Sequence, residues 1–163
     1  TAHFVFGSDG GGSRRLIIPD GCFRVDAALP ESFGQRDRQK LFMDGPEIFN
    51  FTLRVVPQCV QEVCSQSGRA QTEIELFLFH QANAFMLRHL AKKMKLDSGK
   101  VPMNIERFGN VSSASIPLLM VTSVADRVRG ENIPVLMAGF GVGFSWCAAI
   151  IEFSKPRVVE LID

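Results

Sequence analysis

The chain has 163 residues, of which 46% are hydrophobic and 21% are charged, so it can form one domain with a sizeable core and is too apolar to be disordered. Its net charge of +1 gives no overall attraction for nucleic acid, and no apolar run approaches the ~18 residues of a membrane-spanning helix. The cysteines lie at positions 22, 59, 64 and 147 without CxxC spacing. We therefore expect reduced, buried thiols in a cytoplasmic protein rather than a disulfide framework.

Residues 1–41 predict an opening hairpin and a surface loop. Two short apolar runs flank a glycine-rich turn between positions 3 and 19, and residues 20–41 are polar and irregular. The turn is not followed by the GK[ST] of a phosphate-binding loop, so we reject that function for it.

A long helix is predicted to begin at Pro46. Proline followed by Glu47 is typical of a first helical turn, apolar residues then recur at helical spacing, and Gly68 marks the end. We expect a kink at Pro57, because a proline inside a helix costs about 3 kcal/mol.

The rest of the chain alternates strands with helices. We predict strands over 73–79, 101–107, 133–141 and 144–153, and helices over 82–96 and 115–129. This order indicates an α/β fold with a mixed, mostly parallel five-stranded sheet and helices on both faces. Residues 42–153 would form the main domain and residues 154–163 a C-terminal tail.

Two polar residues follow predicted strands of this sheet. His80 comes after the strand at 73–79 and Asn110 after the one at 101–107, and sites in open sheets form beyond the carboxyl ends of strands. A neutral imidazole and a carboxamide each offer an N–H donor, and two donors on one carbonyl oxygen stabilise an oxyanion or enolate. Taken singly, a histidine at a strand end is more often structural, and a Gly-Asn turn is usually only a turn.

Two other kinds of site are not favoured. The stretch "GFGVG" at 139–143 is followed by a predicted strand rather than a helix, so we reject a dinucleotide-binding fingerprint, although its glycines would let backbone amides approach a ligand. No second histidine, acid or cysteine stands at ligand spacing from His80, so we expect no metal site.

Four motifs taken together resemble a known family. They are "FMDGPEIFNF" (42–51), "LFHQAN" (78–83), "RFGNVSSASIP" (107–117) and "GFGVGFSW" (139–146). In this order they resemble the carboxyl-terminal half of a β-ketoacyl-[acyl-carrier-protein] synthase III of the thiolase superfamily. The resemblance runs from about Phe42 to Phe153. It implies one thiolase-like half of a five-layered α/β/α/β/α fold with a Cys-His-Asn triad, in which His80 and Asn110 match the histidine and asparagine.

The resemblance also implies a reaction, the initiating condensation of fatty acid biosynthesis. A cysteine takes an acyl group from acyl-CoA, and His80 and Asn110 then hold the thioester carbonyl of malonyl-[acyl-carrier-protein] during decarboxylation, so that the enolate attacks the acyl-cysteine. No cofactor is implied beyond the CoA and phosphopantetheine that carry the substrates. The nucleophilic cysteine belongs to the amino-terminal half, and none of the four cysteines matches it. We therefore expect a fragment that is inactive alone, with a homodimer in the full enzyme.

Further positions carry over from the family. The pantetheine tunnel is matched by Met43, Gly45, Phe49, Ala82, Asn83 and Phe140. The amide of Val142 matches an oxyanion-hole donor. The patch that receives the acidic carrier protein is matched by Lys92 and Lys93, which could equally be a solvated helix face. Phe85 stands where an arginine is common, and Arg88 one turn on would compensate; Asn50 replaces a common lysine, which leaves carrier preference open.

Three alternatives are open at this point. One is a related acyltransferase of a specialised pathway, which would use the same His80 and Asn110 with another acceptor. The second is a non-catalytic module that binds a carrier or partner protein. A papain-like Cys-His-Asn protease is disfavoured, because no "CGSCW"-type segment is present.

Overall fold

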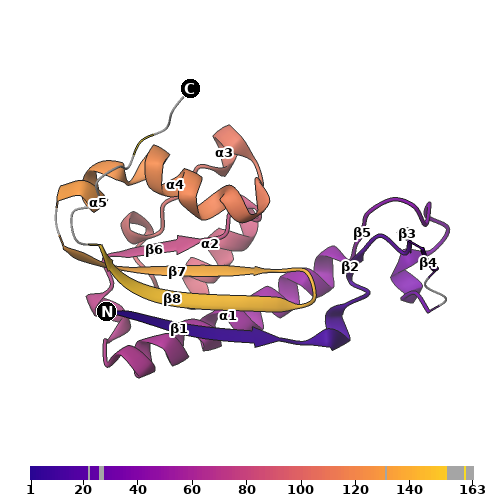
Figure 1. Cartoon of the computed structure of the whole chain (residues 1–163), viewed down its shortest axis with the longest axis horizontal. Helices are drawn as coiled ribbons and strands as arrows, with labels where there is room; N and C mark the ends of the chain where they lie inside the picture. The colour runs from indigo at the N-terminus through magenta and orange to yellow at the C-terminus, as the bar shows by residue number, and fades with distance from the viewer. Residues whose placement is uncertain (22, 26–27, 131, 154–159, 161–163) are drawn as a thin grey trace.

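A computed structural model describes residues 1–21, 23–25, 28–130, 132–153 and 160. Cys22 and, apart from Glu160, the predicted tail at 154–163 lie outside the described residues. Over the described part, the main sheet has four strands in the order β1-β8-β7-β6 (Figure 1). These are β1 (Ala2–Ser8), β6 (Leu76–Phe79), β7 (Ile133–Gly141) and β8 (Ser145–Phe153).

The prediction of a mostly parallel five-stranded sheet is wrong in two respects. The sheet has four strands among the described residues, and only the β6–β7 pairing is parallel, whereas β8 runs antiparallel to both of its neighbours. The cause is the tight turn after β7, which folds β8 back beside it and into the position between β7 and β1.

The strand predicted over 101–107 does not form. This segment contains a bend followed by the one-turn helix α3 (Ile105–Phe108). Pro102 lacks a backbone N–H, and the backbone N–H of Asn104 donates to the side chain of Gln81 over 3.2 Å. Val101 likewise donates its backbone N–H to the carbonyl of Ser98 over 3.2 Å. The backbone donors at positions 101, 102 and 104 are thus missing or used by nearby turns and a side chain rather than by a neighbouring strand.

The predicted hairpin over 3–19 is also wrong, because its two strands pair elsewhere. β1 pairs along its whole length with β8, from Ala2 opposite Ile151 to Ser8 opposite Ser145. The short β2 (Leu16–Ile17) pairs instead with β5 (Phe42–Met43). Between them, the 3-10 turn η1 (Gly10–Gly12) packs so closely on Phe144 that a Cβ at Gly12 would lie 2.1 Å from its ring.

The remaining part of the first 44 residues forms an extension beside the start of the first helix (Figure 1). It contains the two-stranded pair β3 (Asp20–Gly21) and β4 (Arg24–Val25) and the 3-10 turn η2 (Glu31–Phe33). Its small core consists of Ile17, Phe33 and Phe42, and Arg38 forms an ion pair with Asp20 over 2.8 Å.

The long helix α1 (Gly45–Ser67) confirms the predicted start and end. Asp44 caps its first turn by accepting from the backbone N–H of Glu47, and Gly68 ends it in the left-handed conformation with φ 71°. Helical hydrogen-bonding geometry continues through Pro57. α1 packs against β1 and β8 and against α2 (Ala84–Lys93), so these two helices cover one face of the sheet.

The other face of the sheet is covered at β6 and β7. The helix predicted over 115–129 is divided at Val124 into α4 (Ser115–Ser123) and α5 (Ala125–Gly130). Leu119 and Val128 from these helices pack against Leu76 and Leu78 of β6. α4 and α5 lie together over this face of the sheet (Figure 1). Helices therefore lie on both faces, as predicted, and His80 follows the buried strand between them.

Short 3-10 turns complete the described elements. They are η3 (Gln71–Glu73), η4 (Ser98–Lys100) and η5 (Ser112–Ala114). None of the described helices has both the length and the apolar character that a crossing of a membrane requires.

Candidate active site

Two neighbouring cavities meet at His80 and Asn110. The first, of about 590 Å³, is bounded by the serines before α4, and we call it the serine cavity. The second, of about 550 Å³, lies against the first turns of α1 and α2 and is lined largely by aromatic and aliphatic side chains, so we call it the aromatic cavity. The residues that line both are Leu16, Met43, His80, Asn110, Phe140 and Gly141.

The fold brings His80 to this junction at the end of β6. The backbone N–H of His80 donates to the carbonyl of Ala138 over 2.9 Å, which continues the β6–β7 pairing by one residue. Its ring lies edge-on to Phe140, with centroids 5.5 Å apart and an interplanar angle of 79°. The adjacent Gln81 is buried and donates from Nε2 to the carbonyl of Phe79 over 2.9 Å. These contacts fix the segment that carries the imidazole.

A chain of hydrogen bonds sets the tautomer of His80. Nδ1 lies 3.0 Å from Oγ of Ser115, and that hydroxyl donates its only proton to the carbonyl of Ser112 over 2.6 Å. The Ser115 oxygen must therefore accept from Nδ1–H. In the neutral ring Nε2 then carries a lone pair, so it is an acceptor until the ring is protonated. The sequence analysis expected a neutral donor here and did not single out Ser115.

Burial decides which form of His80 is favoured. Removal from water lowers the pKa of His80 below its usual value, and hydrogen bonding to the Ser112 carbonyl opposes this effect without cancelling it. The neutral ring, with Nε2 as a proton acceptor, is therefore the resting form at neutral pH. A polar serine at the first position of the apolar helix α4 was the available sequence signal for this arrangement.

Asn110 lies in a turn after α3. The prediction that it follows a strand over 101–107 is therefore wrong, although its side chain still lines both cavities. The preceding Gly109 has φ 68°, a conformation that favours glycine. The side-chain Oδ1 of Asn110 accepts from the backbone N–H of Ser112 over 3.0 Å. Since the oxygen is engaged, the NH₂ group is the part of the carboxamide left to donate to a ligand.

The residues predicted to line a pantetheine tunnel lie together. Met43, Gly45, Phe49, Ala82, Asn83 and Phe140 all line the aromatic cavity. Asn83 also caps α2, because its Oδ1 accepts from the backbone N–H of Met86 over 2.8 Å. Their contact with a pantetheine group remains a prediction.

Val142 lies at the serine cavity, in the turn between β7 and β8. The turn is held by Phe144, whose ring stacks on Phe51 of α1 with centroids 4.0 Å apart. Asp9 and Phe144 also exchange two backbone hydrogen bonds of 2.7 Å each. The turn is therefore fixed from two sides, and the use of the Val142 amide as an oxyanion donor stays a prediction.

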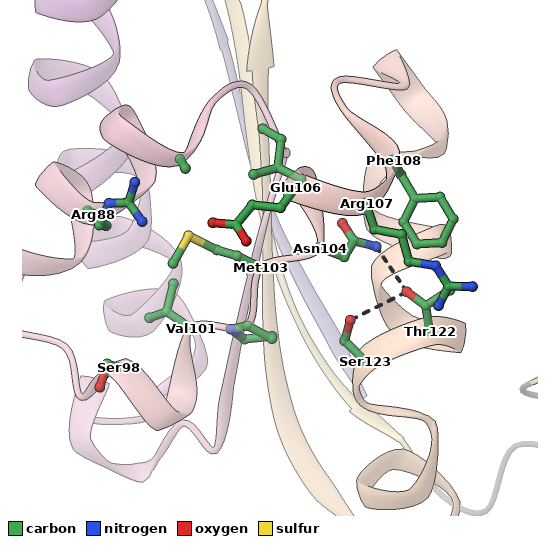
Figure 2. A pocket seen from close by; sticks show the side chains of 13 residues that line it. Arg88, Ser98, Val101, Met103, Asn104, Glu106, Arg107, Phe108, Thr122 and Ser123 are labelled. Carbon is green, nitrogen blue, oxygen red and sulfur yellow. Dashed lines mark hydrogen bonds between the residues drawn. The ribbon is translucent and has the colours of Figure 1, made fainter.

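The basic residues predicted to bind a carrier protein are distributed over the outer surface of α2. Lys92 and Lys93 are exposed in its last turn. Arg88 lines a separate cavity of about 580 Å³ between α2, α3 and α4 (Figure 2). In that cavity Asn104 donates from Nδ2 to Oγ1 of Thr122 over 2.9 Å. Arg88 is thus not part of the lining of the aromatic cavity.

The described cysteines do not offer a nucleophile at this site. Cys59 and Cys64 are buried on α1, and Cys147 is half-buried on β8. Burial raises the pKa of Cys59 to about 11 and raises the pKa of the other two thiols, which disfavours the reactive thiolate. None of these three cysteines lines the serine or the aromatic cavity. Among the described residues, no cluster of three metal-ligating side chains is found.

Comparison with known proteins places the fold in the thiolase-like α/β class. A crystal structure of a 3-oxoacyl-(acyl-carrier protein) synthase from Burkholderia xenovorans superposes with a TM-score of 0.91 at 48% identity, over 98% of this chain and 46% of that one. A β-ketoacyl-[acyl-carrier-protein] synthase III structure from Thermus thermophilus gives a TM-score of 0.80 at 32% identity, over 94% of this chain and 46% of that one.

The family follows from the sequence match. The family model for the 3-oxoacyl-[acyl-carrier-protein (ACP)] synthase III C terminal matches residues 64–153, and the chain therefore belongs to that family. The β-ketoacyl-[acyl-carrier-protein] synthase III of Symbiobacterium thermophilum is 34% identical over 152 residues, which cover 93% of this chain and 45% of that protein. The chain thus spans about half the length of the curated relatives it matches.

Proposed function

We propose that this chain is the half of a condensing enzyme that supplies His80 and Asn110 to the decarboxylative condensation of an acyl-CoA with malonyl-[acyl-carrier-protein]. The observation that carries the proposal is their convergence: two side chains from separate segments line the same two cavities. The engaged Oδ1 of Asn110, which leaves the NH₂ group to donate, and the family to which the chain belongs support the same conclusion.

The nucleophile would come from the half of the enzyme outside this chain. In the first step Nε2 of His80 accepts the proton of a cysteine thiol, which yields a thiolate and an imidazolium. The thiolate attacks the acyl-CoA thioester, and the CoA thiolate that leaves takes a proton from solvent. The hydrogen bonds through Ser115 support this assignment, since they leave Nε2 as the accepting nitrogen.

In the second step both side chains donate hydrogen bonds. The imidazolium of His80 and the NH₂ of Asn110 bind the thioester carbonyl of the malonyl group, so that negative charge can develop on this oxygen as carbon dioxide leaves. The resulting enolate attacks the acyl-cysteine, the new carbon–carbon bond forms, and the cysteine thiolate is released. His80 remains protonated in this step and the thiolate–imidazolium pair is restored.

The other residues with a proposed role in binding the substrates lie around His80 and Asn110. The residues of the aromatic cavity would hold the pantetheine arm, and the amide of Val142 would donate to the acyl-cysteine oxygen. Lys92 and Lys93, together with Arg88, would attract the acidic carrier protein. The full enzyme would be a homodimer of two-half subunits.

The test uses the complete enzyme, with both halves. We expect His80→Ala and Asn110→Ala each to slow decarboxylation of malonyl-[acyl-carrier-protein] by about 10²- to 10³-fold, the usual effect of losing one oxyanion donor. Intact-mass measurement should show normal cysteine acylation in Asn110→Ala. In His80→Ala acylation should be slow at neutral pH and recover as the pH rises, because the thiol then ionises without a base.

His3→Ala is the matched control, since this histidine lies on β1 away from both cavities. It should leave both steps unchanged. Normal decarboxylation of the malonyl substrate by His80→Ala would contradict the proposed role.

A further inference from the structure

Three polar side chains next to the candidate active site are joined by hydrogen bonds, and we call Gln81, Asn104 and Thr122 the polar network. Gln81 is 1% exposed, and its Oε1 accepts from the backbone N–H of Asn104 over 3.2 Å. Nδ2 of Asn104 donates to Oγ1 of Thr122 over 2.9 Å (Figure 2). That hydroxyl donates its only proton to the carbonyl of Leu118 over 2.6 Å, so the direction of each bond is fixed.

The polar network joins the three elements that carry the site. Gln81 directly follows His80 at the end of β6. Thr122 belongs to α4, whose first residue, Ser115, is hydrogen-bonded to His80. Asn104 directly precedes α3. The network thus holds β6, α3 and α4 in one arrangement.

The single turn of α3 connects Asn104 to Asn110. The carbonyl of Asn104 accepts from the backbone N–H of Phe108 over 3.2 Å, and the N–H of Gly109 donates to the carbonyl of Ile105 over 2.8 Å. Asn110 is the next residue in the chain. Because these hydrogen bonds hold the turn together, the position of Asn104 determines where the side chain of Asn110 begins.

The two proposed donors must keep a precise separation. A carbonyl oxygen that receives two hydrogen bonds needs both donors at about 2.7–3.1 Å, and a misplacement of about 1 Å can slow a reaction about 10²-fold. His80 is held by β6 and by its bond with Ser115. Asn110 is exposed, and its Oδ1 accepts from a backbone N–H only two residues away. The polar network supplies a connection between these two segments that needs no ligand.

We propose that Gln81 is a positioning residue that sets, through Asn104, the distance between His80 and Asn110 in the decarboxylation step. This inference rests on the function proposed above. Gln81 belongs to the lining of neither the serine nor the aromatic cavity, so it acts through the two donors rather than by touching the substrate. An apolar side chain of similar length would fill the same space without this effect, since apolar contacts have no preferred direction and hydrogen bonds do.

The test replaces Gln81 with methionine in the complete enzyme, which keeps the length of the side chain and removes its hydrogen bonds. We expect decarboxylation of malonyl-[acyl-carrier-protein] to slow about tenfold, because this step needs both donors on one oxygen. Acylation of the cysteine by acyl-CoA, followed by intact mass, should change less than about twofold, because this step uses Nε2 of His80 alone. A general loss of folding would slow both steps together.

A double-mutant cycle with Asn110→Ala locates the effect. If Gln81 acts through the position of Asn110, Gln81→Met should slow decarboxylation no further in an enzyme that already carries Asn110→Ala. An equal additional loss in that background, or a normal rate in the single variant Gln81→Met, would overturn the positioning role alone. Normal decarboxylation by the single variant Asn110→Ala would instead refute the proposed function, so the two failures are distinguishable.

Val63→Ala is the control for stability, because Val63 is fully buried in the core on α1 and lines neither cavity. It should lower the denaturant midpoint and leave the ratio of the two rates unchanged. Thr122→Val is a second test of the network, because it removes the acceptor of Asn104 Nδ2 at a half-buried position. It should slow decarboxylation about two- to threefold and leave acylation normal. Equal slowing of both steps by Thr122→Val, or of neither, would overturn the proposal even if Gln81→Met does not fold.

Discussion

Ser115 holds His80 in one tautomer. Its Oγ lies 3.0 Å from Nδ1 of the imidazole, and its hydroxyl donates a hydrogen bond to the carbonyl of Ser112 over 2.6 Å. The nitrogen that remains available, Nε2, can therefore take up a proton before it can donate one. The first turn of α4 thus determines what His80 can do chemically.

The first prediction removes this hydroxyl. Ser115→Ala deprives Nδ1 of its acceptor, so the neutral ring can hold its proton on either nitrogen. We expect a condensation rate about tenfold lower in the complete enzyme, within the range of losing an orienting hydrogen bond. The imidazole ¹⁵N shifts should move from a single tautomer toward a mixture, while an unchanged circular dichroism spectrum shows that the protein is still folded.

The control is Ser65→Ala, an exposed serine on α1, which should leave both the rate and the ¹⁵N shifts unchanged. Unaltered shifts in Ser115→Ala would mean that this serine does not determine the tautomer.

The second prediction concerns Asp44, which joins the extension to α1. Its Oδ2 accepts from Ser32 Oγ over 2.7 Å and from Arg15 Nη1 over 3.0 Å, and its Oδ1 accepts from the N–H of Glu47. The hydrogen bond from Ser32, with those from Glu47 and Arg15, lowers the pKa of Asp44 below 3.8 despite an opposing effect of burial. Asp44→Ala should therefore destabilise the fold by about 1–2 kcal/mol, the usual cost of losing an N-cap.

The sign of the pH dependence follows from the lowered pKa. Because the folded-state pKa lies below that of the unfolded chain, the contribution of Asp44 is complete well above 3.8. It is lost as the pH falls through the folded-state pKa. Asp44→Asn keeps a capping side chain but cannot titrate, so its denaturant midpoint should fall less steeply with acid than that of the unsubstituted protein. Asp126→Asn, which removes a fully exposed carboxylate paired with Arg129, should retain the original acid dependence.

Much of this arrangement could be predicted from local signals, and the errors came from distant contacts. Pro46 and Gly68 mark the ends of α1 because capping and proline preferences act within one turn. By contrast, the segment at 101–107 loses its strand because Gln81, 23 residues away from Asn104, takes up a backbone donor. No spacing rule within that segment contains this information.

The candidate active site likewise combines features that local sequence signals predict with features that depend on distant contacts. His80 could be predicted at the end of a buried strand, since β6 is apolar throughout. Asn110 was expected beyond a second strand, yet it reaches the same cavities from the turn at Gly109. The serine at the start of α4 marks a polar group on an apolar helix, but its hydrogen bond with His80 depends on how α4 packs on β6, which the amino-acid pattern alone does not specify.

The third prediction tests the basic end of α2. Reversing the charge at both Lys92 and Lys93 to glutamate should raise the KM for the malonyl carrier protein about five- to tenfold at low salt, since exposed charges mainly steer the encounter. The KM for malonyl-CoA, which has no acidic protein attached, should change less. Adding Arg88→Glu to this double substitution tests whether Arg88, which lines the cavity between α2, α3 and α4, also contributes to carrier-protein binding. A further rise in the KM for the carrier protein would show that it does. Equal losses with both substrates would indicate damage to the fold.

The last prediction concerns the 163-residue chain on its own. Phe4 and Phe6 of β1 are 49% and 74% exposed, with stacked rings whose centroids lie 6.1 Å apart. They alternate with Val5, which packs in the core with α1, so they point to the opposite face of the sheet. An exposed apolar surface of this kind favours association. We expect self-association in sedimentation experiments, weakened by Phe6→Glu and not by Phe23→Glu at the exposed loop.

The isolated chain should also be inactive in condensation, because the described cysteines line neither cavity and their thiols have raised pKa values. Intact-mass measurement after incubation with acyl-CoA should show no stoichiometric acyl adduct. Acylation of Cys22, Cys59, Cys64 or Cys147 followed by turnover with malonyl carrier protein would show that the nucleophile lies within this chain. A monomer at high concentration would contradict only the association through Phe4 and Phe6. The two measurements therefore separate the chemistry that depends on a second half from the surface that such a half would cover.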